Sequence, residues 1–524
     1  MIIITSASYI SQDISSEFGL IPPAFLPVGN KRLYNYQIAC LPEMERRVLT
    51  IPESFTVSSH DQMQLNSLNV EVLKIPENQT LGESVICAIN LSSNPPEAPL
   101  CILHGDTLIQ DLPGDKLDIV TLSEVDGAYN WAVWNDSDDE PFTQLEDTPM
   151  IGRVKIANGY FAFSDCGLFV HSVINSAGNF IQGVNAYSRE RTLTPVDVEQ
   201  WLDFGHDHTF YRSKARMTTQ RAFNKLDISP KTVRKSSSDT KKMQAEYDWF
   251  SLLPDELRIF TPQLIRQLDG PDFGYEIQYL YLASLNELYV FGRLPRFIWR
   301  KIFQGCFAFL DACREHQPDS PMKSNMSALF NDKTQHRLEL YQNSTGIDLD
   351  RPWTINGTET PSIKEIAKQT AAMIPAADNA ALCVMHGDFC FSNILYDFRA
   401  QAIKVIDPRG CMPCGETSLF GDQRYDLAKL AHSVIGLYDF IVAGYYTIEI
   451  SGHELKFNFP DSHAIDDLQP MFLHMVNEHF GLDKRALCAM QIHLFLSMIP
   501  MHADNPERQT AFLANTLRLY TELS

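Results

Sequence analysis

The sequence contains no long apolar run. Although 44% of its 524 residues are hydrophobic, no uninterrupted apolar stretch approaches the ~20 residues that a membrane-spanning helix needs. The N-terminal stretch MIIITSAS is apolar but short, and it lacks the positively charged start of a signal peptide. We therefore expect a buried strand at this end of the chain, no membrane insertion and a cytoplasmic location.

Basic residues are scarce. Lysine and arginine number 43 against 65 aspartates and glutamates, which leaves a formal net charge of -22 at pH 7. Coulomb repulsion then opposes an encounter with nucleic acid or with an anionic membrane surface. A small phosphorylated ligand remains compatible with this charge, because its binding depends on a local site.

Cysteine occurs in an odd number and without a framework. The 11 cysteines are scattered from Cys40 to Cys488, a pattern typical of reduced, mostly buried thiols rather than of disulfides. The one C-x-x-C motif, Cys411 to Cys414, has no second pair nearby to complete a tetrahedral zinc site. A structural role is therefore favoured over metal binding or redox chemistry.

Three polar residues stand out in the stretch 384–410, VMHGDFCFSNILYDFRAQAIKVIDPRG. Asp388 follows a His-Gly pair, Asn393 comes next, and Asp407 ends the apolar run IKVI. Phosphoryl transfer from a nucleotide needs a carboxylate to accept the acceptor's hydroxyl proton, and oxygen ligands to hold Mg²⁺ on the phosphates. The alternative is a loop in which Asp388 caps a turn and Asp407 ends a strand.

The spacing H-G-D-x-x-x-x-N, followed by a strand ending in I-D-P, resembles the aminoglycoside phosphotransferase and choline kinase superfamily, a branch of the protein-kinase-like fold. The resemblance implies ATP as phosphoryl donor, Asp388 as catalytic base, and Asn393 and Asp407 as Mg²⁺ ligands. The later piece R-Y-D-L-A-K-L resembles the superfamily's helix start, where an aspartate, here Asp426, supports the catalytic loop. A carboxylate that complements the helix dipole is a compatible interpretation.

A kinase small lobe is predicted upstream of this stretch. The pattern T-V-R-K, followed by a helical A-E-Y-D-W-F, resembles the lobe in which a strand lysine holds the nucleotide phosphates and pairs with a helix glutamate. The matching residues are Lys235 and Glu246, with Arg234 competing for the role of Lys235. A solvated KSSSDTKK loop is the alternative. The hinge, whose backbone meets adenine in kinases, corresponds to the segment from Tyr279 to Leu282.

The acceptor site is less clearly marked. Residues 293–380 are expected to form helical patches separated by polar loops, notably SALFNDKTQHRLELY (327–341) and DLDRPWTINGTETPS (348–362). Several residues are candidates for lining an acceptor pocket, although exposed surface or a structural role accounts for each of them as well. They are Lys333, Arg337, Trp353, Arg409, His502, Asp504 and Arg508.

The first third of the chain begins with the β-branched run of residues 2–5, a predicted buried strand, followed by a polar loop up to Gly19. Strand, loop and helix in this order present backbone N–H groups to phosphates in nucleotide-binding domains. The phrase FLPVGNKRL, residues 25–33, resembles the sugar-phosphate nucleotidyltransferases. Further matches follow in order: LGES (81–84) with Gly82 in the nucleobase-recognising turn, CILHGDTLI (101–109), SDCGLFVHS (164–172) and EQWLDFGHDHTFY (199–211).

That resemblance implies that Asp106 and Asp203 bind Mg²⁺. The implied reaction is attack by a sugar-phosphate or alcohol-phosphate oxygen on the α-phosphate of a nucleoside triphosphate, CTP or another, with the carboxylates holding the metal. Taken singly, a strand-end turn explains Asp106 and a cap explains Asp203 equally well. His206 and His208 could ligate a metal beside Asp203, but no third ligand is evident.

The phosphate loop departs from the family. The family's loop is rich in glycine and contains an arginine, whereas the stretch from Thr5 to Gly19 has one glycine and no basic residue. Pro23 stands where the family has a lysine, so Lys31 or Arg32 supplies the neutralising charge or the charge is missing. Because lost cations weaken the stabilisation of a developing phosphate charge, a binding module without turnover remains an open alternative.

Length and motifs together predict two domains. We expect an α/β, GT-A or Rossmann-like nucleotidyltransferase domain over residues 1–222 and an α+β protein-kinase-like domain over residues 223–524. The small lobe of the latter would span about 223–285 and the large lobe about 286–524.

The predicted function is that of a bifunctional enzyme. An ATP-dependent kinase of a sugar, polyol or amino alcohol and a nucleotidyltransferase would together make an activated precursor for a surface polysaccharide such as a capsule. In the first alternative only the kinase is active, and the N-terminal domain is a degenerate nucleotide- or sugar-binding regulatory module. In the second, the kinase fold is a binding platform. The expected partners are a small hydroxyl acceptor and its phosphate. The acceptor, the nucleobase and the oligomeric state have no signal in the sequence.

Overall fold

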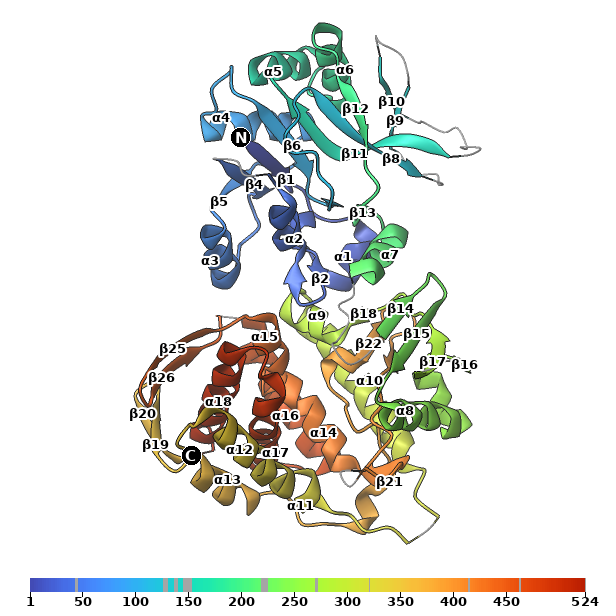
Figure 1. Ribbon diagram of the computed structural model, residues 1–524, viewed down its shortest axis with the longest axis vertical. Helices are drawn as coiled ribbons and strands as arrows, with labels where there is room; N and C mark the ends of the chain where they lie inside the picture. Colours follow the sequence, from blue (N-terminus) through green and yellow to red (C-terminus); the bar gives the residue numbers. More distant parts are fainter. Residues whose placement is uncertain are drawn as a thin grey trace. The chain divides into compact units, whose positions relative to one another are not determined.

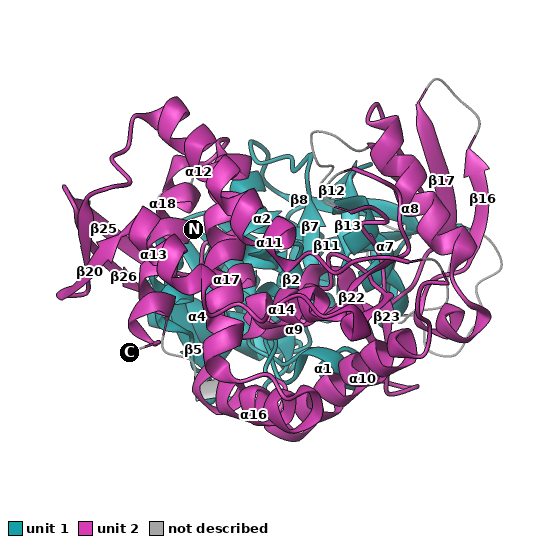
Figure 2. Cartoon of the chain, turned by 90° about the horizontal axis from the view of Figure 1, so that it is seen from below, with its two compact units in different colours: residues 1–218, 291–293 teal, residues 219–290, 294–524 magenta. Residues whose placement is uncertain are grey.

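The structure of the chain is a computed structural model. It describes residues 1–42, 46–125, 131–135, 140–144, 153–217, 225–268, 272–319, 321–412, 415–460 and 463–523. The chain divides into two compact units, coloured separately in Figure 2: unit 1 is Met1–Thr218 with Phe291–Arg293, and unit 2 is Thr219–Val290 with Leu294–Ser524. Among the described residues, no helix combines the length and the apolar character needed to cross a membrane.

Unit 1 is built on a mixed nine-stranded sheet, in which the order β10-β9-β11-β6-β1-β4-β5 is extended by β8 on β11 and by β12 on β8. The strands β6, β1, β4 and β5 run parallel, whereas β11 is antiparallel to β6. The strands are β1 (Ile2–Thr5), β4 (Arg47–Pro52), β5 (Val70–Ile75), β6 (Leu100–His104), β8 (Ile119–Val125), β9 (Ala132–Trp134), β10 (Phe142–Gln144), β11 (Val154–Phe163) and β12 (Thr194–Asp197).

The helices of unit 1 bury their apolar faces on this sheet. A continuous core joins strands β1, β6 and β11 to three helices, through residues such as Val85, Phe169 and Val184, and Figure 1 shows these helices beside the sheet. The helices are α1 (Gln12–Phe18), η1 (Pro23–Phe25), α2 (Leu33–Cys40), α3 (Ser59–Ser67), α4 (Leu81–Ser92), α5 (Cys166–Asn175), α6 (Phe180–Glu190) and α7 (Asp207–Met217). Two short two-stranded antiparallel sheets complete the unit: β2 (Pro27–Val28) with β3 (Lys31–Arg32), and β7 (Thr107–Ile109) with β13 (Trp201–Asp203).

Two local predictions in unit 1 were wrong. The polar loop after β1 contains the helix α1, because Ile14 and Phe18 lie one turn apart and are buried together. The supposed turn LGES is the first turn of α4, closed by a capping box between Thr80 and Glu83. Gly82 lies in that turn, where an added Cβ would stand 2.3 Å from the Gly178 carbonyl oxygen. Close packing therefore explains why a glycine is needed here, and its contact with a nucleobase stays a prediction.

The small lobe of unit 2 is a four-stranded antiparallel sheet with the order β14-β15-β17-β16. Helix α8 packs against β15, β16 and β17. Its members are β14 (Lys225–Ile228), β15 (Thr232–Ser237), β16 (Leu264–Leu268), β17 (Phe273–Gln278) and α8 (Thr240–Leu252), followed by η2 (Asp255–Phe260).

The large lobe of unit 2 is mainly helical, and its centre is α17, which packs against α12, α13, α14 and α18. The helices are α9 (Leu285–Val290), α10 (Arg296–Arg314), α11 (Met326–Leu329), α12 (Asn331–Thr345), α13 (Ile363–Ala371), η3 (Asn379–Ala381), η4 (Phe391–Asn393), α14 (Gln423–Val434), α15 (Tyr438–Ala443), α16 (His463–Phe480), α17 (Lys484–Met498), η5 (Ile499–His502) and α18 (Pro506–Thr521). The strands are β18 (Ala283–Ser284), β19 (Pro352–Ile355), β20 (Thr358–Ser362), β21 (Leu382–Val384), β22 (Ile394–Asp397), β23 (Ala402–Val405), β24 (Phe420–Asp422), β25 (Thr447–Ser451) and β26 (Glu454–Asn458).

Two predicted polar loops of the large lobe are regular structure. The stretch 327–341 lies in α11 and α12, because Thr334, Leu338 and Tyr341 recur at helical spacing and are buried. The stretch 348–362 contains the hairpin of β19 and β20, whose β19 pairs in parallel with β26. Pairing across about a hundred residues leaves no local signal, so the sequence pattern could not show it. The two predicted fold classes, α/β for the first domain and two-lobed α+β for the second, are confirmed.

Gln37 on α2 joins that helix to the turn after β6. Its side-chain amide is fully buried and donates to the carbonyl oxygens of His104, Gly105 and Thr107 at 3.1, 3.1 and 2.8 Å. We predict that Gln37→Leu destabilises the protein by about 2 kcal/mol, because the two amide hydrogens that serve these three carbonyl oxygens are lost at roughly 1 kcal/mol each. Urea unfolding measures this difference. The matched control is Gln62→Leu, whose amide bonds Asn66 on the exposed face of α3. An equal midpoint for both variants would contradict the assigned role of Gln37.

Candidate active sites

The kinase-like site of unit 2 joins two loops. Asn393 donates from its side-chain amide to the Asp388 main-chain oxygen at 2.9 Å and to the Asp388 carboxylate at 3.0 Å. The Ile406 N–H, next to Asp407, donates to the Asn393 carbonyl at 3.0 Å. Asp407 itself has a φ of 56°, in the left-handed region that is costly for a residue with a side chain. The hydrogen bonds therefore bring the three sequence-predicted residues into one site.

Asp426 holds the loop that carries Asp388. Its two carboxylate oxygens accept the His386 and Gly387 backbone N–H groups, both at 2.7 Å, and the side chain is buried. Burial raises the pKa of Asp426 to about 7, while these two donors oppose that rise. Gly387 has a φ of 79° and lies against Arg409, so a side chain here would be strained and crowded.

Lys235 links the small lobe to Asp407. Its ammonium lies 2.6 Å from a Glu246 carboxylate oxygen and 3.1 Å from the Asp407 carboxylate. The Tyr275 hydroxyl donates to Glu246 at 2.9 Å. The competing Arg234 pairs with Glu276 instead, at 3.1 Å, and is about half exposed. Geometry therefore favours Lys235 over Arg234, and the residue lies in β15 rather than in a solvated loop.

The oxygen ligands expected for Mg²⁺ are present in this site. Asn393 uses its amide nitrogen towards Asp388, which turns its oxygen to the other side, and Asp407 contributes a carboxylate. Oxygen donors of this kind suit a small, hard divalent ion. Tyr279 and Leu282, the predicted hinge, are half-buried between β17 and β18, where the Tyr279 N–H donates to the Lys231 carbonyl.

Lys429 is a member of the site that the sequence reasoning missed. It is buried on α14, and its ammonium lies 2.8 Å from the Asp388 carboxylate. Burial alone would raise the pKa of Asp388, but Lys429 and then Arg409 outweigh it and hold the pKa well below its usual range. Asp388 is therefore ionised at neutral pH. The sequence signal that could have indicated Lys429 is its position one helical turn after Tyr425, on a helix whose other residues are almost all buried.

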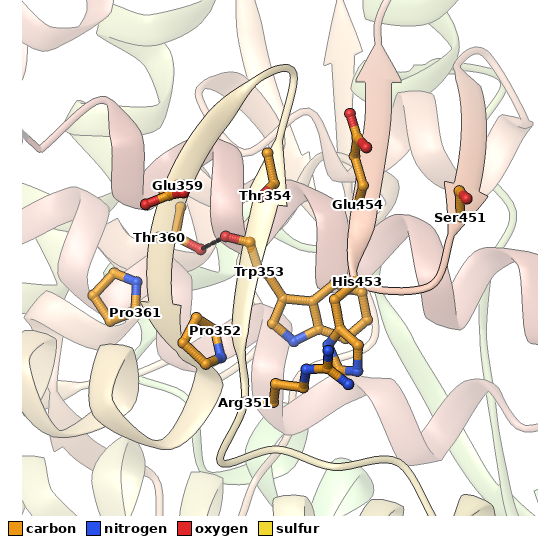
Figure 3. A pocket seen from close by; sticks show the side chains of 10 residues that line it. All are labelled: Arg351, Pro352, Trp353, Thr354, Glu359, Thr360, Pro361, Ser451, His453 and Glu454. Atoms are coloured by element: carbon orange, nitrogen blue, oxygen red, sulfur yellow. Dashed lines mark hydrogen bonds between the residues drawn. The ribbon is translucent and has the colours of Figure 1, made fainter.

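Other residues predicted to line an acceptor pocket have partners outside the group of Asp388, Asn393 and Asp407. Trp353 lies on β19 and stacks on His453 with ring centroids 4.4 Å apart. Figure 3 shows both side chains in a pocket of about 810 Å³. Arg508 approaches His502 at 3.4 Å. Cys414 lies outside the described residues.

The site of unit 1 joins Asp106 and Asp203. Asp106 follows β6, and Asp203 ends β13, which pairs with β7 so that Asp203 stands opposite Thr107. The Phe204 N–H donates to the Asp106 carbonyl at 2.8 Å. A Cβ on Gly205 would lie 2.4 Å from an Asp106 carboxylate oxygen and 3.3 Å from one of Asp203. Both carboxylates therefore face this glycine. Asp106 also adjoins the start of the Thr5–Gly19 loop, because the Gly105 N–H donates to the Thr5 carbonyl.

Hydrogen bonds hold Asp203 in place. It accepts from the Gly205 N–H at 2.9 Å and from the Thr209 hydroxyl at 2.6 Å, and His206 Nδ1 lies at 2.8 Å. The hydrogen bond to Asp203 raises the pKa of His206, while burial and then the Asp203 charge raise the pKa of Asp106 to about 6. Two crowded carboxylates fit a divalent cation. The described residues contain no group of three or more His, Cys, Asp and Glu side chains placed to bind a metal, so the idea of a histidine-built site gains no support.

The neutralising charge expected from Lys31 or Arg32 is not placed at these carboxylates. Arg32 is buried in an ion pair with Asp61 and donates to the Phe25 carbonyl. Lys31 is exposed and lies 6.0 Å from the Tyr36 ring centroid. Both residues belong to β3, whose short hairpin directs them to these partners. Within the described residues, the cationic group that acts on Asp106 is His206.

Comparisons with known proteins concern the fold. Unit 1 is similar to a Bacillus anthracis protein assigned as a glucose-1-phosphate thymidylyltransferase, at 14% identity over 42% of this chain and 96% of that one, with a TM-score of 0.34. Unit 2 is similar to a Ralstonia eutropha protein assigned as an aminoglycoside phosphotransferase, at 11% identity over 60% and 94% of the chains, with a TM-score of 0.36. It is also similar to an aminoglycoside-3'-phosphotransferase of type VIII, at 12% identity over 59% and 99%, with a TM-score of 0.31.

No protein-family model matches the chain, and no curated protein matches it. The two structural resemblances predicted from the sequence are confirmed at the level of fold. At these identities and scores they say nothing of residue roles, which rest on the geometry of this chain.

The crowded carboxylates of unit 1 predict a pH-dependent gain of stability in Asp106→Asn. Because the pKa rises from 3.8 to about 6 on folding, the carboxyl costs no stability below its unfolded pKa, costs increasingly more between pH 3.8 and about 6, and has a constant cost above that. We expect the metal-free variant to be more stable by roughly 1–3 kcal/mol at pH 7.5 and equal to the parent near pH 3, below the unfolded pKa. Urea unfolding at both pH values measures this, with the exposed Asp115→Asn as control. A gain that is independent of pH would contradict the assignment.

Proposed function

We propose that unit 2 is a kinase that transfers the γ-phosphoryl group of ATP to a hydroxyl group of a small molecule. The observation that carries this proposal is the placement of Asp388 beside Asn393, together with Lys235 bridging Glu246 and Asp407. Phosphoryl transfer needs these parts in this arrangement: a carboxylate for the acceptor hydroxyl, oxygen ligands for Mg²⁺ and a cation for the phosphates.

Each residue has a distinct part in the proposed reaction. Lys235, oriented by Glu246, holds the nucleotide phosphates, and Asn393 and Asp407 would bind Mg²⁺, which supplies neutralising charge when bound. Asp388 accepts a hydrogen bond from the acceptor hydroxyl and aligns its oxygen with the γ-phosphorus. Since its pKa is low, Asp388 takes the proton late, as the new O–P bond forms. The Tyr279–Leu282 segment would meet the nucleobase through its backbone.

The kinase assignment predicts that Asp388→Asn lowers kcat by ~10²–10⁴-fold, because it removes the base at nearly constant volume. It also lowers the melting temperature, because the buried Lys429 loses its ion-pair partner. The measurement is ADP formation with ATP, Mg²⁺ and a panel of hydroxyl compounds. Asp255→Asn is the matched control, since the Asp255 side chain is 89% exposed. Near-normal turnover in Asp388→Asn would reject the role of Asp388.

For unit 1 we propose metal-dependent handling of a nucleoside triphosphate, CTP or another. The convergence of Asp106 and Asp203 favours nucleotidyl transfer, in which a phosphate oxygen attacks the α-phosphate and pyrophosphate leaves. The ion pair of Arg32 with Asp61 favours the alternative, a regulatory module that binds a nucleotide or sugar without turnover, because Arg32 is then engaged away from the phosphates. In the first case the kinase would make the phosphate that unit 1 activates, and the expected product class is an activated precursor for surface polysaccharide.

Pyrophosphate release separates these two functions. If unit 1 is a nucleotidyltransferase, the chain releases pyrophosphate from a nucleoside triphosphate and the kinase product. Asp106→Ala should abolish that release and leave kinase activity intact, whereas Asp388→Asn should do the reverse when the phosphorylated acceptor is supplied. Binding of a nucleoside triphosphate by the parent protein without pyrophosphate release would assign unit 1 as a binding module.

A further inference from the structure

Three cationic side chains lie near Tyr425 and the proposed base of the kinase. Lys429 lies 2.8 Å from the Asp388 carboxylate. The Arg409 guanidinium donates to the Tyr425 hydroxyl at 3.1 Å and lies 5.1 Å from the centre of that ring. Lys333 on α12 also interacts electrostatically with Tyr425. A single buried tyrosine thus connects cations from three separate segments of the chain.

The fold brings these segments together for identifiable reasons. Tyr425 and Lys429 lie one turn apart on α14, so they share a face of the helix. Arg409 follows the Asp407 loop and is anchored to the catalytic loop, because its N–H donates to the His386 carbonyl at 2.8 Å and its side chain lies against Gly387. The cluster of Lys333, Arg409 and Lys429 is therefore tied to the position of Asp388.

The three cations outnumber the carboxylates in direct contact with them. Among the described residues, Lys429 pairs with Asp388, while Asp426 and Asp439 act on Arg409 and Lys429 from farther away, with their pKa values raised to about 7 and about 6. Tyr425 raises the pKa of Lys333, but burial and repulsion from Arg409 and Lys429 outweigh it and lower the pKa. Burial raises the pKa of Tyr425, but the same cations outweigh that effect and lower the pKa to about 8. Because partly buried charge without a partner is costly, an anion is expected to complete the cluster.

The cluster and the residues assigned to the nucleotide meet Asp388 through different oxygens. The nucleotide phosphates are assigned to Lys235, Asn393 and Asp407. Lys235 contacts Asp407 from the small lobe. Lys333 and Lys429 lie instead on helices of the large lobe. Asp388 contacts Asn393 through one carboxylate oxygen and Lys429 through the other. A hydroxyl on Asp388 therefore has the nucleotide site on one side and the cluster on the other.

We propose that the acceptor is an anionic alcohol, with a phosphate or carboxylate group near its reacting hydroxyl, and that Lys333 and Arg409 bind that anion. The proposal rests on the kinase function proposed for unit 2. The acceptor oxygen forms a bond to the γ-phosphorus, the bond from that phosphorus to the ADP oxygen breaks, and the hydroxyl proton passes to Asp388. Among the expected acceptors, this proposal disfavours an amino alcohol, whose positive charge the cluster would repel.

A matched substrate panel tests the proposal. ADP formation is measured with glycerol, glycerol 3-phosphate and glycerate, with glucose, glucose 1-phosphate and gluconate, and with choline and ethanolamine. We expect the anionic members to exceed their neutral partners in kcat/KM by about tenfold or more, the gain of one charge-assisted contact. The phosphate and carboxylate members show which anion is preferred. A preference for a neutral or cationic acceptor overturns the proposal.

Variants then locate the anion. Lys333→Gln and Arg409→Gln should raise KM for the anionic acceptor roughly 10- to 100-fold and leave KM for ATP unchanged, while Lys333→Arg retains most of the affinity. Lys368→Gln, whose side chain is 80% exposed on α13, is the matched control. A rise in KM for ATP instead would assign the cluster to the nucleotide and overturn the proposal. Loss of turnover in Asp388→Asn with every acceptor tests the kinase function separately.

Inorganic phosphate serves as a probe if no panel member is phosphorylated. In saturating ADP and Mg²⁺, phosphate should raise the melting temperature of the parent protein and of Lys368→Gln, and should raise it less in Lys333→Gln. An equal effect on all three proteins would overturn the proposed anion site, whether or not unit 2 is a kinase.

Discussion

The proposed kinase site depends on one buried carboxylate, that of Asp426, and the two backbone N–H groups that it accepts. These bonds fix His386 and Gly387, and hence the direction in which Asp388 leaves the loop. Asp426 lies on helix α14, which begins at Gln423 and is capped by the Asp422 side chain. The same helix places Lys429 against Asp388. A single rigid helix therefore sets both the position of the base and its charge, which is the kind of support that a precisely placed polar group needs.

In unit 1, close backbone packing at glycines brings the Asp106 and Asp203 carboxylates together. Glycines at 105 and 205 allow close approach, since a side chain at Gly105 would meet the Thr5 carbonyl and one at Gly205 would meet both carboxylates. Gln37 holds the turn between His104 and Thr107 by three hydrogen bonds. The result is a pair of carboxylates that repel each other in the folded chain, with the pKa of Asp106 raised to about 6. Repulsion held in place by the fold is typical of sites built for a cation.

Sequence reasoning succeeded where an interaction is local or where a motif has fixed spacing. The stretch around Asp388 and Asn393 lies within one loop, and its partner Asp407 follows the next hairpin, so spacing alone indicated the group. It failed where the partner is distant. The ion pair of Arg32 with Asp61 removes a cation that the sequence left available, and the β19 hairpin is completed by β26. The cation Lys429 was overlooked because a lysine in a helix is most often solvated.

The amino-acid sequence by itself determined the two fold classes, the residue types needed for phosphoryl transfer and the absence of a basic phosphate loop. These follow from short-range pattern: apolar periodicity, turn residues and motif spacing. Tertiary structure alone decided that Lys235 rather than Arg234 meets Glu246 and that the carboxylates of Asp106 and Asp203 both lie against Gly205. It alone also decided that Arg409 meets Tyr425 and that Lys429 meets Asp388. Charges act over a few ångströms in space, whatever their separation along the chain, so their balance in a site exists only once the chain is folded.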